Sequence, residues 1–401
     1  MRVSLVALLL AEPDAAKAAA ECIGEAEAWD ECADLALVWG ALPRLCERLA
    51  AFGYPIPPKM NSLLLDGGAR TVMQARGSLA ALRRFAQAGL RTVAFKGLAS
   101  LAVLYGDPRR RVMADADILI AEADLEQACT LLGEIGFSAG LHGSLAEYRA
   151  FLRNAPGFGG NEELEFQDGR STSIDLHWRL GAGFDPAALI TRARPAVLLG
   201  TEFLAVAPAD GLLLTVHHSL RNHFNPDVIL RDLLDIGLWC AALEESGEVR
   251  EAVKAAGEHG LAVPMRALTG ILGGFDPGCS AARVAEETGL HISQRGRKEA
   301  AALCALFDTQ LREGAMDRDL LYLLRPAEAL QIAKGLLFGG RRHLEIARAM
   351  DTALAGKPVG ARQRVGAILG ALRSMRPRHF RMLRSLARAK DTFARSGAKV
   401  S

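Results

Sequence analysis

The stretch RRRVMADADILI, residues 109–120, places two aspartates one residue apart inside an apolar run. Side chains alternate along a strand, so a strand here turns Asp115 and Asp117 to one face and Ile118 and Ile120 to the other, toward a core. A carboxylate in such surroundings is unfavourable unless an opposite charge compensates it. Two carboxylates on one face can converge on one hard cation, and Mg²⁺ usually takes one or two carboxylates together with phosphate oxygens. The stretch therefore predicts a strand that holds a divalent metal ion.

A third carboxylate follows in STSIDLHWRL, residues 171–180, which has the alternation of another strand. Asp175 shares its strand face with His177 and Arg179. If the two strands are neighbours, Asp175 joins the same site, and three carboxylates can hold two metal ions that clamp an in-line phosphoryl displacement. Imidazole is a poor ligand for Mg²⁺, so we expect His177 to support the site or to pack, and not to bind the metal. The alternative for Asp175 is an ion pair with Arg179.

The tripeptide FKG, residues 95–97, ends a predicted strand and opens a short predicted helix. Gly97 permits a tight turn and a close approach of the backbone by a ligand, and the helix N-terminus that follows favours phosphate. Lys96 adds a point charge for a triphosphate. Arg111 offers a second cation for phosphate, with a plain surface charge as the alternative. The two arginines before it are expected to be solvated.

Apolar periodicity divides the chain into four regions. Residues 1–89 and 206–355 have helical spacing, residues 90–205 alternate short strand and helix patterns, and residues 356–401 form a basic helical tail. We therefore predict an α+β fold, with a small mixed β-sheet flanked by N-terminal and C-terminal helical regions. The alanine- and leucine-rich composition, with only 6% aromatic residues, argues against an all-β chain.

The tail carries most of the positive charge. Residues 361–401 contain eleven Arg and Lys residues and one acidic residue, although the whole chain has a net charge of +2. The predicted tail helix places an apolar row on one face and arginines on another; the row consists of Phe380, Leu383, Leu386 and Phe393. We interpret it as a solvated amphipathic helix. Binding of nucleic acid through this helix is the weaker alternative, because aromatic residues are sparse.

The seven cysteines are scattered, and no CxxC pair occurs. This pattern argues against a disulfide framework and a zinc-thiolate site, and it favours a reducing cytoplasm. No apolar stretch approaches the ~20 residues that a membrane-spanning helix needs. Within the second helical region, His217, His218 and His223 are expected to pack or cap. Asp232 and Asp235 are predicted to pair with nearby arginines, Arg221 or Arg231.

The segments FKGLASLAVLYGDPRRRVMADADILI, LLGEIGF and IDLHWRL together resemble the uncharacterised nucleotidyltransferase family of the DNA polymerase beta-like superfamily, over about residues 90–180. That family has a Lys-Gly turn, a short helix, an arginine, an Asp-x-Asp pair, a helix and a late Asp-Leu-His-Trp strand. The resemblance implies that Asp115 and Asp117 match the metal-binding pair and Asp175 the third acid. It also implies that Gly97 lies under the triphosphate and that Lys96 and Arg111 match basic positions. The superfamily usually has Gly-Ser at the turn, and here Leu98 follows Gly97, so the serine contact is missing.

The resemblance implies a Mg²⁺-dependent enzyme, with Mn²⁺ as a substitute metal. It would move a nucleotidyl group from a nucleoside triphosphate (NTP) such as ATP to an acceptor and release pyrophosphate. The acceptor stays open among a small molecule, a peptide and a protein side chain. Two alternatives remain from the residues: a catalytically silent binding module that works through its basic tail, and a metal-dependent phosphohydrolase that uses the same acids.

Overall fold

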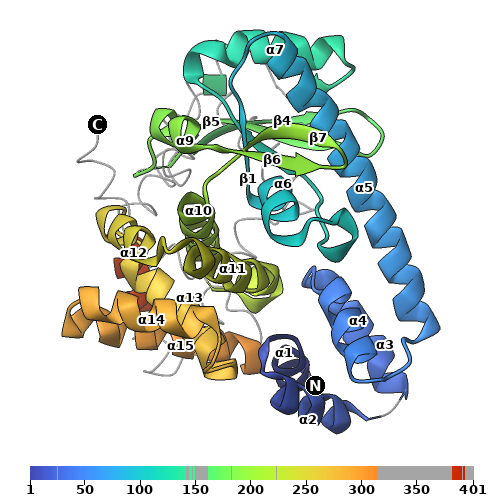
Figure 1. Ribbon diagram of the computed structural model, residues 1–401, viewed down its shortest axis with the longest axis vertical. Helices are drawn as coiled ribbons and strands as arrows, with labels where there is room; N and C mark the ends of the chain where they lie inside the picture. Colours follow the sequence, from blue (N-terminus) through green and yellow to red (C-terminus); the bar gives the residue numbers. More distant parts are fainter. Residues whose placement is uncertain are drawn as a thin grey trace, which may run out of the picture.

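A computed structural model describes residues 1–313, apart from residues 25, 141–143, 147, 150–160, 182 and 223, and then residues 382–390 and 392. Along the chain, helices come first, a seven-stranded sheet with short helices follows, and helices come last (Figure 1). This arrangement confirms the predicted α+β class with a mixed sheet and flanking helices. The three predicted domain boundaries stay predictions, and the one at residues 355–356 lies outside the described residues.

The N-terminal region is helical, with α1 (Arg2–Leu10), α2 (Pro13–Ile23), α3 (Ala26–Val38), α4 (Leu42–Ala51) and α5 (Pro58–Gln87). The 30-residue helix α5 begins at Pro58, where a missing N–H costs nothing, and ends just before Gly89, which has a φ of +78°. Figure 1 shows α5 running along one side of the molecule, from the N-terminal helices to the sheet. There it packs against β2, β5 and β7, so it fixes the sheet relative to the N-terminal helices.

The sheet has the strand order β3-β4-β5-β2-β1-β7-β6. Its strands are β1 (Val93–Phe95), β2 (Ala116–Leu119), β3 (Ser138–Ala139), β4 (Asn161–Gln167), β5 (Ser173–Leu180), β6 (Arg194–Leu198) and β7 (Thr201–Ala205). Strand β2 pairs antiparallel with β1 and parallel with β5, so the sheet is mixed. The predicted strands around residues 95, 117 and 175 are thus confirmed as β1, β2 and β5, and they are the three central strands. The other four strands were not predicted.

Short helices connect these strands. They are α6 (Lys96–Ser100), the π-helical turn η1 (Leu101–Tyr105), the 3-10 turns η2 (Pro108–Arg110) and η3 (Glu122–Asp124), α7 (Leu125–Glu134) and α9 (Pro186–Arg192). Helix α6 follows β1 directly, and η1 continues it without a break. The short helix predicted after Gly97 is therefore present.

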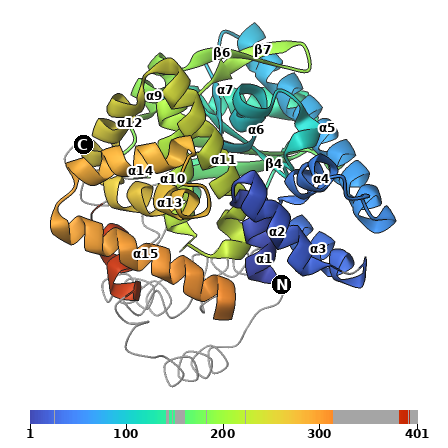
Figure 2. The ribbon, with the colours of Figure 1, turned by 60° about the horizontal axis from the view of Figure 1, so that its bottom comes forward.

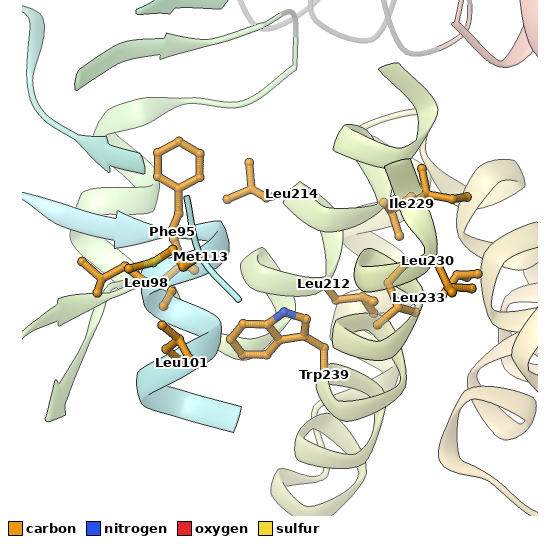
Figure 3. Close-up of a cluster of buried hydrophobic side chains, with 14 of the residues drawn as sticks. Phe95, Leu98, Leu101, Met113, Leu212, Leu214, Ile229, Leu230, Leu233 and Trp239 are labelled. Atoms are coloured by element: carbon orange, nitrogen blue, oxygen red, sulfur yellow. The ribbon is translucent and has the colours of Figure 1, made fainter. Parts of the chain in front are cut away.

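The C-terminal helices are α10 (Pro208–Arg221), α11 (Pro226–Ser246), α12 (Val249–Glu258), α13 (Ala262–Phe275), α14 (Ser280–His291) and α15 (Gln294–Glu313). Figure 3 shows how α10 and α11 join the sheet region through a buried apolar cluster. Phe95, Leu98, Leu101 and Met113 from the sheet region meet leucines and Trp239 from α10 and α11. The approach is close, because a Cβ added at Gly211 of α10 would lie 2.6 Å from the Trp239 ring. Tight packing of this kind holds the two regions in one arrangement.

Part of the basic tail is described. Residues 382–390 form a helix that lies beside α15 (Figure 2). Leu383 and Leu386 are buried, whereas Arg384 and Arg388 are exposed, and Arg388 pairs with Glu299 of α15. This confirms the amphipathic pattern for these residues, although the apolar face is covered. Phe380 and Phe393 lie outside the described residues.

All seven cysteines are free thiols. In the part of the chain that the structure describes, no helix is both long enough and apolar enough to cross a bilayer.

Candidate functional site

The three predicted acids lie at the centre of the sheet. Asp117 of β2 stands directly opposite Asp175 of β5 in the parallel register, and opposite Phe95 of β1. Asp115 precedes β2 by one residue and is exposed, Asp175 is half-buried, and Asp117 is 3% exposed. The pairing of β2 with β5 thus brings Asp117 and Asp175 side by side. From the sequence, this pairing was the condition for Asp175 to join the site.

Two cationic or hydrogen-bonding side chains hold Asp117. Lys96 Nζ donates to Asp117 Oδ1 at 2.5 Å, and His177 Nε2 lies 3.0 Å from the same oxygen. Burial opposes ionisation of this carboxyl, but Lys96 and His177 outweigh it and hold the pKa of Asp117 below its usual range. In the metal-free protein, Asp117 is therefore a carboxylate paired with an internal ammonium group.

Asp175 lacks such compensation. Burial, and then the charges of Asp117, Glu163 and Asp115, raise the pKa of Asp175 to about 8. An excess of carboxylates at one place is the environment that a divalent cation relieves. Ligand atoms of Asp117, Asp175 and His177 all lie within 4.8 Å of one another. The donor set and its unrelieved charge therefore fit a hard divalent metal ion, which the two carboxylates would hold.

A fourth acid belongs to this cluster and was not predicted. Glu163 Oε2 of β4 lies 3.2 Å from His177 Nδ1. Burial raises the pKa of Glu163, but His177, Lys96 and Arg221 outweigh this and lower it. His177 therefore stands between two carboxylates: its Nε2 lies at hydrogen-bond distance from Asp117, and its Nδ1 lies near Glu163 without a hydrogen bond. Its supporting role stays a prediction. The alternation in NEELEFQ, residues 161–167, was the available signal, but three glutamates are unusual in a strand.

The turn at Lys96 and Gly97 forms the other side of the site. Lys96 has a φ of +48°, a left-handed backbone conformation that residues other than glycine rarely adopt. At this residue the chain turns from β1 into α6. A Cβ added at Gly97 would lie 3.0 Å from Arg111 Nη1 and 3.1 Å from Met113 Cγ. A larger residue at position 97 would therefore press on Arg111 and Met113, so packing favours glycine there independently of any ligand.

Arg111 is not a surface charge. It is 4% exposed, and its Nε and Nη2 donate to Asp235 of α11 at 2.7–3.0 Å, while Tyr105 also donates to Asp235. Burial opposes the charged form, but Asp235 outweighs it and raises the pKa of Arg111. The guanidinium is thus fixed, charged and already compensated.

The predicted partners of Asp232 and Asp235 were wrong. Asp235 pairs with Arg111, and Asp232 Oδ2 lies 2.7 Å from His218 Nδ1 of α10. Sequence spacing along one helix suggested local arginines, but packing of α11 against η1 and α10 brings other partners within reach. His223 lies outside the described residues.

One pocket collects most of these side chains. Lys96, Gly97, Arg111, Asp115 and Asp117 form one wall, and residues of α10 and α11, including His218 and Asp232, form the opposite wall. Asp175 and His177 stand beside Asp117 on the next strand and are not among the residues that line this pocket. The arginines before Arg111 bind elsewhere: Arg109 pairs with Asp107, and Arg110 pairs with Glu47.

The candidate site thus combines carboxylates for a cation with a lysine and a glycine turn for phosphates. It lies at a pocket between the sheet and the helices α10 and α11. No curated protein and no solved structure matches the chain. One family profile, described as an uncharacterised nucleotidyltransferase, matches residues 25–272, which include the whole sheet and the helices α10, α11 and α12. The chain therefore belongs to the uncharacterised nucleotidyltransferase family.

Proposed function

We propose that the protein transfers a nucleotidyl group from an NTP to an acceptor in a reaction that depends on Mg²⁺, or on Mn²⁺ in its place, and releases pyrophosphate. The observation that carries the proposal is the cluster of Asp115, Asp117 and Asp175 beside the Lys96-Gly97 turn. A cluster of carboxylates alone suits many cations. A cluster that faces a lysine and a close-packed glycine turn suits a cation that carries phosphates.

Asp115, Asp117 and Asp175 would hold the metal. When bound, the metal would neutralise phosphate charge and lower the pKa of the attacking oxygen. His177 orients Asp117 from behind, because its Nε2 lies 3.0 Å from Asp117 Oδ1 and its Nδ1 lies 3.2 Å from Glu163. An aspartate held in this way presents its remaining lone pairs in a fixed direction.

Lys96 and Arg111 serve the triphosphate in different ways. Lys96 neutralises Asp117 in the metal-free protein, and it is a quarter exposed, so its flexible stem can turn toward a phosphate. Arg111 cannot turn, because Asp235 holds it through three contacts. It contributes fixed N–H groups that lie close to Gly97, at the wall of the pocket.

Thermal unfolding with ligands tests the proposal. Mg²⁺ and NTP together should raise the unfolding temperature more than either alone, because a ligand that binds only the folded state adds about 2.7 kcal/mol at a concentration 100 times its dissociation constant. Asp115→Ala should lose this joint stabilisation. Asp66→Ala, which removes an exposed aspartate on α5, should keep it. No joint stabilisation of the folded protein with any of the four common NTPs contradicts the proposal.

A further inference from the structure

A second cleft adjoins the candidate site. Its cavity volume is about 220 Å³, and residues of α1, α4, α11 and α13 are among those that line it. Figure 1 shows where these helices lie. The floor of the cleft is apolar, and the apolar side chains include Leu9, Leu10, Leu234, Leu238 and Leu272. Small-molecule sites are typically concave and mostly apolar. Apart from the wall that the two cavities share, this cleft is lined by none of the residues assigned above to the metal or the nucleotide.

That wall consists of Arg111 and Arg231, which line both cavities. Leu238, Leu234 and Arg231 are spaced at i, i−4 and i−7 on α11, so they lie along one face of the helix. Seven residues of helix correspond to about 10 Å. Leu238 is 38% exposed and Leu234 is half-buried, so an apolar row faces the cleft and ends at an arginine beside the carboxylates.

The arginine at the inner end has unused hydrogen-bonding capacity. Arg231 Nε is buried and has no hydrogen-bond partner among the residues that the structure describes, and Arg231 Nη1 reaches the Val112 carbonyl only at 3.5 Å. At the outer rim, Arg44 and Arg110 share the single carboxylate of Glu47. A buried donor without an acceptor is costly, and a charged oxygen is its strongest partner. The cleft thus combines an apolar row with arginines that suit an anion.

We propose that this cleft binds the acceptor, and that the acceptor is a phosphate monoester with an apolar body about 10 Å long. The apolar body would lie along Leu234 and Leu238, and the phosphate would pass Arg231 toward Asp115. This inference rests on the proposed nucleotidyl transfer. An oxygen of the phosphate monoester forms a bond to the α-phosphorus of the NTP, the bond from that phosphorus to the β-phosphate bridge breaks, and pyrophosphate leaves. The product is a diphosphate diester, and no oxidant or further reactant is needed.

Calorimetric titration of the full chain with n-octyl phosphate tests the class of acceptor, with inorganic phosphate and n-octanol as partial probes. Octyl phosphate should bind at least roughly tenfold more tightly than either, since it alone fills the apolar row and satisfies Arg231. Its binding should also show a negative heat-capacity change, the mark of apolar burial. Equal binding of octanol would overturn the assignment of a phosphate, and equal binding of inorganic phosphate would overturn the assignment of an apolar body.

Variants locate the binding. Leu238→Asp and Arg231→Met should each weaken octyl phosphate roughly tenfold or more. Leu290→Asp, which changes a leucine that is 77% exposed on α14, should not alter it. If Leu238→Asp is folded and binds octyl phosphate as tightly as the unaltered chain, the proposed cleft is wrong.

The joint stabilisation by Mg²⁺ and NTP separates the two proposals. Leu238 does not line the metal pocket, so Leu238→Asp should keep that stabilisation while it loses octyl phosphate. Octyl phosphate binding without any joint stabilisation would contradict nucleotidyl transfer and leave the cleft as a binding site. Joint stabilisation without octyl phosphate binding would contradict the cleft assignment alone.

Discussion

Proton release from Asp175 should control metal binding. Its pKa of about 8 means that a proton occupies this carboxyl through most of the neutral range, and a metal ion must displace it. Asp175 would be about 1% ionised at a pH near 6 and about half ionised at a pH near 8. If only the ionised form binds, the affinity for Mg²⁺ should rise roughly 50-fold between these two values.

Calorimetric titration with Mg²⁺ at several pH values, in buffers of different ionisation enthalpy, measures both the affinity and the protons released. Asp175→Asn should bind Mg²⁺ more weakly and should lose most of the pH dependence, whereas Asp66→Asn should behave like the unaltered chain. An affinity for Mg²⁺ that is the same near pH 6 and near pH 8 would refute the reasoning, and so would an unchanged pH dependence in Asp175→Asn.

The same group predicts how the stability of the metal-free protein changes with pH. The folded-state pKa of Asp175 lies above its ordinary value of 3.8, so the contribution of Asp175 to stability is fully present below about pH 4. It is lost as the pH rises through about 8. In urea unfolding, the unaltered chain should therefore lose stability between pH 6 and pH 8, and Asp175→Asn should not. Mg²⁺ should offset this loss in the unaltered chain.

Three further substitutions should change the stability of the chain or its binding of ligands. Arg111→Met leaves Asp235 buried without its cation and should lower the free energy of unfolding by about 3–5 kcal/mol in urea, and adding Asp235→Leu should restore most of it; no recovery contradicts the pairing. Gly211→Ala should cost about 1–3 kcal/mol, because its Cβ meets the Trp239 ring at 2.6 Å; unchanged stability would show that α10 can shift. Lys96→Met should bind Mg²⁺ more tightly and NTP more weakly by calorimetry, since Lys96 neutralises Asp117; weaker binding of both would assign Lys96 to folding.

The central strands and the candidate metal-binding acids could be predicted from the sequence, because their signal is local. Alternation predicts Asp115 and Asp117 on one strand face, although Asp115 lies just before β2, and the same rule places Asp175 and His177 together on β5. The register that puts Asp117 opposite Asp175 depends on which strands are neighbours. Alternation does not predict neighbouring strands, so only the family resemblance indicated that Asp175 belongs with the other two acids.

The remaining part of the site depends on contacts between distant segments. Glu163 reaches His177 because β4 pairs with β5, and Asp235 reaches Arg111 because α11 packs on η1. Neither pairing leaves a pattern within one helix or strand. Local spacing even favoured the wrong partners for Asp232 and Asp235, because a helix surface suggests i, i+4 pairs that tertiary packing replaces.

Transfer of label from an NTP measures nucleotidyl transfer itself. The full chain is incubated with Mg²⁺ and each α-³²P-labelled NTP, with and without cell extract and with octyl phosphate in a separate reaction, beside Asp115→Ala/Asp117→Ala. Nucleotidyl transfer at these aspartates should place label on an acceptor and release pyrophosphate in equal amount, and the double variant should do neither. If the folded protein moves no label from any NTP in any of these mixtures, or if the double variant moves as much, nucleotidyl transfer at these aspartates is contradicted.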